Sequence, residues 1–138
     1  MSRENVEIVR RGYELLASAS DESARRAAYP QFSHPDAEIV PPAAYPDAET
    51  SYRGVEGALR WQQELDEIWD DWRIEAERIQ DAGDRIVVFV RVSGTAKQSR
   101  ASVSISTAHV LTMRDGRMTR LEIFLDRRDA LKAVGLAD

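Results

Sequence analysis

The chain has 138 residues, of which 43% are hydrophobic, and its 19 basic and 24 acidic side chains give a net charge of −5. This length fits one domain over residues 1–138, the acidic balance disfavours nucleic-acid binding, and no apolar run approaches a membrane span. With no cysteine, two distant histidines and no resemblance to a signal peptide at its charged start, we expect a cytoplasmic, metal-free and cofactor-free protein that does not enter membranes.

The first half of the chain is predicted to be mainly helical. Residues 5–19 place Val6, Val9, Tyr13 and Leu16 at helical spacing, which indicates a helix lying on a core. A short helix should follow the N-cap at 20–21 and end before Pro30, because a proline restricts the residue ahead of it.

A brief strand is then predicted up to Val40, and residues 43–53 are expected to form a surface connection. After Gly54 a long helix is predicted to run through Trp72. Its apolar residues recur at steps of three and four, at Ala58, Trp61, Leu65, Trp69 and Trp72.

The second half is predicted to be a sheet. Strands are expected at 74–80, 85–93, 101–113 and 117–125, and the Asp115–Gly116 dipeptide suits a tight hairpin between the last two. A final helix at 126–134 would be capped by Gly135. Helices first and a meander last predict an α+β fold in which helices cover one face of a curved, mostly antiparallel sheet.

The predicted strands are apolar on both faces. Val88 and Val90 alternate with Val87 and Phe89, so covering helices account for one set only. A second copy of the chain is the simplest partner for the other set, because a two-fold dimer uses the same patch twice. We therefore expect a homodimer packed sheet to sheet.

The ensemble of short motifs resembles the nuclear transport factor 2-like superfamily, and within it the SnoaL-like branch. The resemblance covers nearly the whole chain and rests on YRGVEG at 52–57, WDDW at 69–72, AHV at 108–110, RDG at 114–116 and DRRDALKAVGL at 126–136. It implies a cone-shaped α+β barrel with a pocket beneath the first and third helices, and dimers through the outer face. Members include ketosteroid isomerase, polyketide cyclases, dehydratases and proteins that only bind, so the fold does not decide the function.

The catalytic positions of the family are mostly vacant in this chain. The helix-one tyrosine of ketosteroid isomerase corresponds to Tyr13, but its base position falls near Pro41 and its meander acid at Ala108. The acid of SnoaL-type cyclases falls near Ile123. The neighbouring Glu122 should face away from the pocket, since a strand reverses sides at each residue.

Strand alternation makes Arg91 the most informative polar candidate, since it shares a face with Val87 and Phe89 that we assign to the pocket. It would either bind an anionic or carbonyl ligand or form a structural ion pair, with Asp70 or Asp71 as candidate partners. The hydroxyl of Tyr13 would either satisfy a buried neighbour or donate to a bound carbonyl.

Alternation predicts that His109 lies on the outer face with Thr107 and Leu111, at the dimer interface, while His34 belongs to a loop. The three tryptophans could be core or pocket wall. Small hydroxyl side chains at 102, 104 and 106 would either leave cavity volume or simply fill the sheet. Most of the acidic series between Glu64 and Asp71 should be a solvated helix face.

These observations favour a dimeric domain that binds a hydrophobic small molecule in an apolar pocket. The predicted lining set is Tyr13, Trp61, Trp69, Phe89, Arg91, Ser106, Ile123 and Leu125. One alternative is an isomerase, cyclase or dehydratase acting on a carbonyl-bearing substrate, with Tyr13 and Arg91 stabilising oxygen charge and Glu122 or Asp36 as base. Another is a non-catalytic interaction module whose cavity is collapsed.

Overall fold

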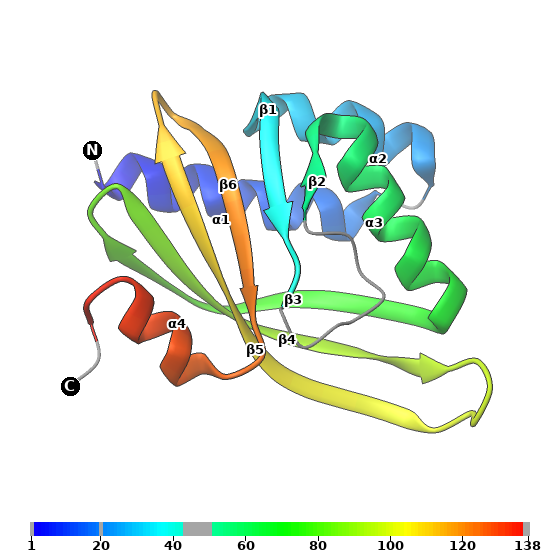
Figure 1. The fold of residues 1–138 in the computed structure, drawn as a ribbon. Helices are drawn as coiled ribbons and strands as arrows, with labels where there is room; N and C mark the ends of the chain where they lie inside the picture. The colour runs from blue at the N-terminus through cyan, green and yellow to red at the C-terminus, as the bar shows by residue number, and fades with distance from the viewer. Residues whose placement is uncertain (1, 20, 43–50, 137–138) are drawn as a thin grey trace.

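The computed structural model describes residues 2–19, 21–42 and 51–136 and has a mixed, strongly curved sheet of six strands as its centre (Figure 1). The strand order is β2-β1-β6-β5-β4-β3, and every neighbouring pair is antiparallel except β1 with β6. The strands are β1 (Ser33–Val40), β2 (Tyr52–Arg53), β3 (Trp69–Ala82), β4 (Arg85–Ala96), β5 (Ser102–Arg114) and β6 (Arg117–Phe124). The predicted α+β fold is confirmed, although the sheet is not closed into a barrel.

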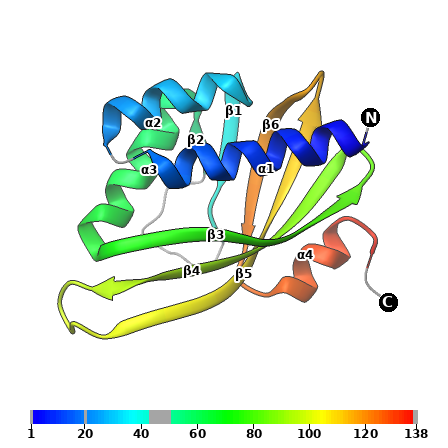
Figure 2. The ribbon, with the colours of Figure 1, turned by 180° about the vertical axis from the view of Figure 1, so that it is seen from behind.

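Three helices and a 3-10 turn gather on the hollow side of the sheet. Helix α1 (Ser2–Ser18) runs across this side, as Figure 2 shows from behind, and α2 (Glu22–Ala28), the 3-10 turn η1 (Tyr29–Gln31) and α3 (Gly54–Ile68) lie toward the β1–β2 edge. The main hydrophobic core lies between these elements and the inner face of the sheet. Its buried members include Val9, Phe32, Ile39, Ile86, Val88, Val90, Leu111 and Leu121.

The long helix ends earlier than its apolar spacing predicts. Helix α3 stops at Ile68, and Trp69 already has extended backbone angles of φ −124° and ψ 143° while its N–H closes the last turn on the Leu65 carbonyl. Trp69 and Trp72 therefore belong to β3, and the prediction that they are helical is wrong. Aromatic side chains favour strands, and the three-residue spacing of the two indoles does not distinguish a helix from the end of one.

The predicted connection at 43–53 is described only in part. Residues 43–50 lie outside the described residues, while Tyr52 and Arg53 form β2 by pairing with Ile39 and Glu38 of β1. Helix α3 starts directly after this pair. Gly57 of α3 has no room for a side chain, because a Cβ there would lie 2.7 Å from the backbone carbonyl carbon of Tyr52.

The hairpin between β5 and β6 turns at Asp115 and Gly116, as predicted. Both residues have positive φ, 52° and 75°, which matches the tight turn whose twist suits two antiparallel strands. Beyond the turn, Met113 pairs with Met118 but Thr112 pairs with Arg120, so β6 carries one extra residue at this point. A bulge of this kind exchanges the faces of all later side chains relative to the partner strand.

The outer face of the sheet is covered in part by the last helix. Helix α4 (Arg127–Ala133) starts at the N-cap Asp126 and ends in a Schellman motif, in which Leu136 N–H bonds the Leu131 carbonyl and Gly135 N–H bonds that of Lys132. Ala130 packs in a second core cluster. The other buried members of this cluster are Val87, Ala108 and Val110. The apolar outer face therefore has a covering element within the same chain.

Candidate functional site

A cavity of about 450 Å³ lies between the helices and the inner face of the sheet. Its walls come from α1, from α2 and η1, from α3, and from β3, β5 and β6. Most of the lining is apolar, and the central apolar side chains are Leu16, Phe32, Leu111, Met113, Met118 and Leu121. This size and character are typical of sites for small organic molecules.

The innermost polar pair of the cavity is Tyr13 on α1 and His109 on β5. The Tyr13 hydroxyl lies 2.6 Å from Nδ1 of His109, and the two rings are nearly parallel with centroids 5.9 Å apart. His109 is 2% exposed although it lines the cavity. The hydrogen bond therefore links the first helix to the middle of the sheet from within the apolar interior.

Burial fixes the protonation states of this pair. It lowers the pKa of His109 from its ordinary value to about 4, because the imidazolium would lose its hydration, and it raises the pKa of Tyr13. Near neutral pH the imidazole is uncharged and the phenol keeps its proton. The arrangement that satisfies both groups has the Tyr13 hydroxyl donating to Nδ1, which leaves the ring proton of His109 on Nε2.

His109 is a lining residue of the cavity, and its second ring nitrogen is Nε2. No hydrogen bond joins it to another residue in the part of the chain that the structure describes. Three side-chain polar atoms in this part of the chain are fully enclosed and lack a hydrogen-bond partner, namely the Tyr29 hydroxyl, Gln62 Oε1 and Thr107 Oγ1. His109 Nε2 is not one of them. Nε2–H is thus a donor without a protein partner that is not fully enclosed, in a mostly apolar lining.

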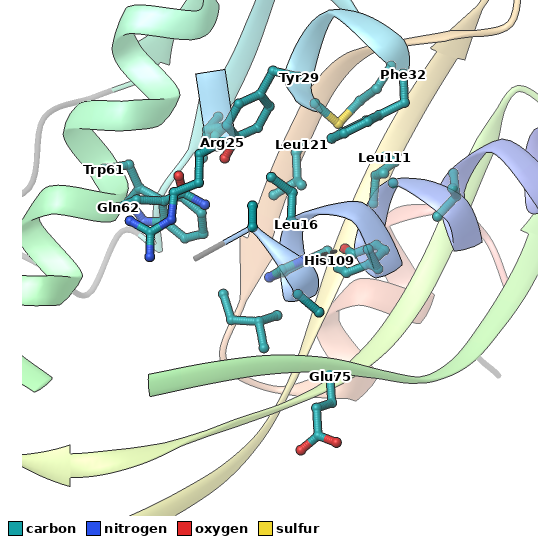
Figure 3. A pocket seen from close by; sticks show the side chains of 18 of the residues that line it. Leu16, Arg25, Tyr29, Phe32, Trp61, Gln62, Glu75, His109, Leu111 and Leu121 are labelled. Atoms are coloured by element: carbon teal, nitrogen blue, oxygen red, sulfur yellow. Dashed lines mark hydrogen bonds between the residues drawn. The ribbon is translucent and has the colours of Figure 1, made fainter. Parts of the chain in front are cut away.

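Polar groups also occupy the side of the cavity near α2 and α3. Tyr29 and Gln62 lie there beside Arg25, across the cavity from His109 (Figure 3). The guanidinium of Arg25 lies 3.3 Å from Asp66 Oδ2 and over the ring of Trp72, at 5.3 Å from its centroid. Since the Trp72 Nε1–H donates to the other oxygen of Asp66 at 2.5 Å, these three side chains hold α2, α3 and β3 together at this end.

Two of the eight predicted lining residues, Tyr13 and Trp61, line the cavity. Ile123 packs against the main core cluster but is not part of the lining. The remaining five, Trp69, Phe89, Arg91, Ser106 and Leu125, lie away from it. Contact of any of the eight with a ligand stays a prediction.

The inward face assigned to Arg91 is wrong. Arg91 points outward, where its Nε donates to Glu77 at 3.0 Å and its Nη1 to Ser104 at 3.0 Å. Glu77, and not Asp70 or Asp71, is its ion-pair partner. Phe89 lies on the same outer face beneath the guanidinium of Arg127, whose central carbon is 4.7 Å from the ring centroid. The side chains of Arg91 and Phe89 both lie on the outer face of β4.

The outward face assigned to His109 is also wrong, and Leu111 lines the cavity beside it. Glu122 does face away from the cavity as predicted. It pairs with Val110, a member of the second core cluster on the outer face, and its Oε1 lies 3.6 Å from Nε of Arg120. Asp36 is exposed on β1 and does not line the cavity, so it is not placed to act as a base there. Of the four catalytic candidates, only Tyr13 reaches the cavity.

Several lining residues were missed at the sequence level. Gln62 falls four residues after Ala58 on the apolar side of α3, so a lone amide in that stripe was a usable signal. Arg25 and Tyr29 carry no such signal, because their positions depend on how α2 and η1 pack on the sheet. Among the described residues, no group of three or more histidine, aspartate or glutamate side chains is placed to hold a metal ion.

Comparison with known families supplies the identity of the fold. Residues 9–121 match the SnoaL-like domain. The chain belongs to the SnoaL-like family. The resemblance inferred from the short motifs is thereby confirmed. The curated proteins contain no match to this SnoaL-like chain.

Solved structures share this SnoaL-like fold over nearly their whole length. TerC, co-crystallised with polyporic acid, is 21% identical with a TM-score of 0.76 over 96% of this chain and 98% of its own. An NTF2-like protein from Burkholderia thailandensis is 26% identical with a TM-score of 0.72, covering 94% of this chain and 95% of its own. A protein from Jannaschia sp. CCS1, proposed to be a SnoaL-like polyketide cyclase, is 19% identical with a TM-score of 0.74, covering 99% and 95%.

The buried state of His109 predicts a specific loss of stability in acid. Between pH 6.5 and about 4 the unfolded chain binds a proton at this residue that the folded chain does not, so the free energy of unfolding should fall as the pH falls. The His109 contribution amounts to about 3 kcal/mol at full protonation. Urea unfolding at a series of pH values measures it.

His109→Asn is the matched control, because its side-chain oxygen can still accept from Tyr13 but does not titrate. The variant should lose distinctly less stability over this pH range than the parent. Parallel curves for the two proteins would show that His109 is not held neutral by burial.

Proposed function

We propose that this SnoaL-like domain binds a mostly apolar small molecule in the cavity beneath α1 and α3. The observation that supports this proposal is the cavity itself, about 450 Å³ in volume, with an apolar lining and an unused polar donor on its wall. A packed domain core keeps few voids larger than a water molecule, so an empty space of this size is unusual in a protein interior. A bound ligand would fill it.

The walls suggest how a ligand would be held. Trp61 and Phe32 offer flat aromatic surfaces, and Met113 and Met118 offer flexible side chains that adapt to an irregular shape. TerC, a structural neighbour, was crystallised with polyporic acid, so a protein of this fold can accept an organic molecule. The alternative of an interaction module with a collapsed cavity has no support from a cavity of this volume.

A second candidate is catalysis on a carbonyl-bearing hydrophobic substrate, as an isomerase, cyclase or dehydratase. The hydrogen-bonded pair of Tyr13 and His109 favours it, since a preorganised donor in a dry site can stabilise charge that develops on oxygen. Among the lining residues that the structure describes, Glu75 is the only carboxylate, and its side chain points away from the cavity in Figure 3. The described lining therefore contains a hydrogen-bond donor that can stabilise charge on oxygen, but no carboxylate that points into the cavity to act as a base.

A steroid or polyketide enone assay tests the catalytic alternative. His109→Asn should abolish turnover, whereas Glu122→Gln and Asp36→Asn should leave it unchanged, because those two carboxylates lie outside the cavity. Turnover that depends on Glu122 or Asp36 would contradict this assignment of roles.

Binding itself is tested by filling the cavity. Leu16→Trp places a large ring in the cavity and should weaken the binding of 9-fluorenone, a flat aromatic ketone, by at least about tenfold, or about 1.4 kcal/mol. Arg11→Trp is the control, since it adds the same side chain at an exposed position of the same helix. Isothermal titration calorimetry measures both. Equal affinity in the two variants, or no binding of either 9-fluorenone or fluorene by the parent, contradicts the proposal.

We also propose that the domain forms a homodimer through the outer face of the sheet. Helix α4 buries Val87, Ala108 and Val110 and its Arg127 lies over Phe89, but the same face continues past the helix to the exposed Ser104 and Ser106. This uncovered part is where a second copy would pack.

The cytoplasmic location expected from the sequence stays a prediction, and no helix in the described ranges is long and apolar enough to cross a membrane.

Size-exclusion chromatography with light scattering measures the assembly. The expected mass is twice that of the chain at micromolar concentration. Arg substitution of Ser106 at the centre of the uncovered face should yield a monomer, while the same change at exposed Gln63 on α3 should not. A monomeric parent protein at this concentration contradicts the dimer.

A further inference from the structure

The polar groups that line the cavity differ in whether they are free to bind a ligand. Tyr13 already donates its proton to His109, and the Arg25 guanidinium is engaged by Asp66 and the Trp72 ring. The oxygen atoms of Tyr29 and Gln62 without partners are fully enclosed. His109 Nε2 is therefore an uncommitted donor of the cavity that is not fully enclosed, and the amide nitrogen of Gln62, across the cavity, is a second one among the described residues.

The hydrogen bond with Tyr13 decides which kind of partner this atom can take. With Nδ1 occupied as an acceptor, the ring proton stays on Nε2, and an N–H group can donate but not accept. The alternative tautomer would place two donors, the hydroxyl and Nδ1–H, against each other unless the hydroxyl found another acceptor. None of the described residues provides a further hydrogen bond to it.

The surroundings of Nε2–H add a second selection by charge. His109 stands on β5 with Leu111 next on the same face, and Leu16 and Ile74 line the cavity from α1 and β3. A cationic or anionic group at this position would lose its hydration without an oppositely charged side chain in contact, which is costly in an apolar wall. A neutral acceptor oxygen loses little.

We propose that His109 determines which ligands bind, because its Nε2–H donates a hydrogen bond to a neutral acceptor oxygen such as a ketone, quinone or lactone carbonyl. This inference rests on the proposed binding function and narrows its ligand class. The ligand is a flat or compact apolar molecule with a carbonyl oxygen on the edge that faces β5. Tyr13 is a positioning residue, because it fixes the tautomer of His109 and does not itself donate to the ligand.

The experiment compares 9-fluorenone with fluorene, which has nearly the same shape but lacks the carbonyl oxygen. Calorimetry gives the ratio of the two dissociation constants for the parent, for His109→Asn and for His109→Gln. A net neutral hydrogen bond corresponds to about a three- to tenfold change in this ratio. Using the ratio removes the general difference in hydrophobicity between the two compounds.

The two variants separate the two nitrogen atoms of His109. The Asn side chain is short and replaces Nδ1 as the acceptor for Tyr13, but it has no group at the position of Nε2. The Gln side chain is longer and places its amide N–H near the Nε2 position. We expect His109→Asn to lose the preference for the ketone and His109→Gln to keep a substantial part of it, and circular dichroism melts report whether both variants are folded.

The outcomes distinguish this inference from the function on which it rests. If fluorene and fluorenone both bind but the ratio is the same in the parent and in His109→Asn, the cavity binds ligands and the role of His109 is wrong. If neither compound binds the parent, both proposals are overturned. If one variant does not fold, the other still decides, because loss of the preference in folded His109→Gln and its retention in folded His109→Asn each contradict the assignment.

Discussion

The hydrogen bond between Tyr13 and His109 is the interaction on which the site depends. It joins α1 to the centre of β5 across the interior, at a hydroxyl to nitrogen distance of 2.6 Å. Breaking it would leave a buried acceptor without a partner, which costs more than an average hydrogen bond contributes. The same contact sets the orientation and tautomer of the imidazole, so structural stability and the chemistry of the cavity share one side-chain pair.

The order of elements in the SnoaL-like fold was predictable from periodicity and turn chemistry. The stripe through Val9, Tyr13 and Leu16, the Asp115–Gly116 turn and the Gly135 cap all have their expected roles. The length of α3 was not predictable in this way, because the indole at Trp69 continues the apolar stripe of the helix while its backbone is already extended. Helix ends without glycine or proline are weakly marked in a sequence.

The faces of the strands were the least predictable feature, and the cause is a single residue. Counted from the turn without a bulge, Ala108 would lie opposite Ile123, and both would point inward with Phe89. The extra residue near Thr119 shifts the pairing, so Ala108 lies opposite Phe124 and His109 opposite Ile123. Directly opposed residues share a face. Ile123 thus points inward as expected, while Phe89, Arg91 and Ser106 point outward and His109 enters the cavity.

The chemistry of the cavity depends most on His109 being neutral, with its proton on Nε2. Nitrogen-15 NMR of histidine-labelled protein measures this directly, and a His34→Gln variant assigns the two signals. Near neutral pH we predict an unprotonated, hydrogen-bonded Nδ1 and a protonated Nε2, unchanged until the pH approaches about 4. An imidazolium at pH 6, or a proton on Nδ1, would contradict this protonation state of His109.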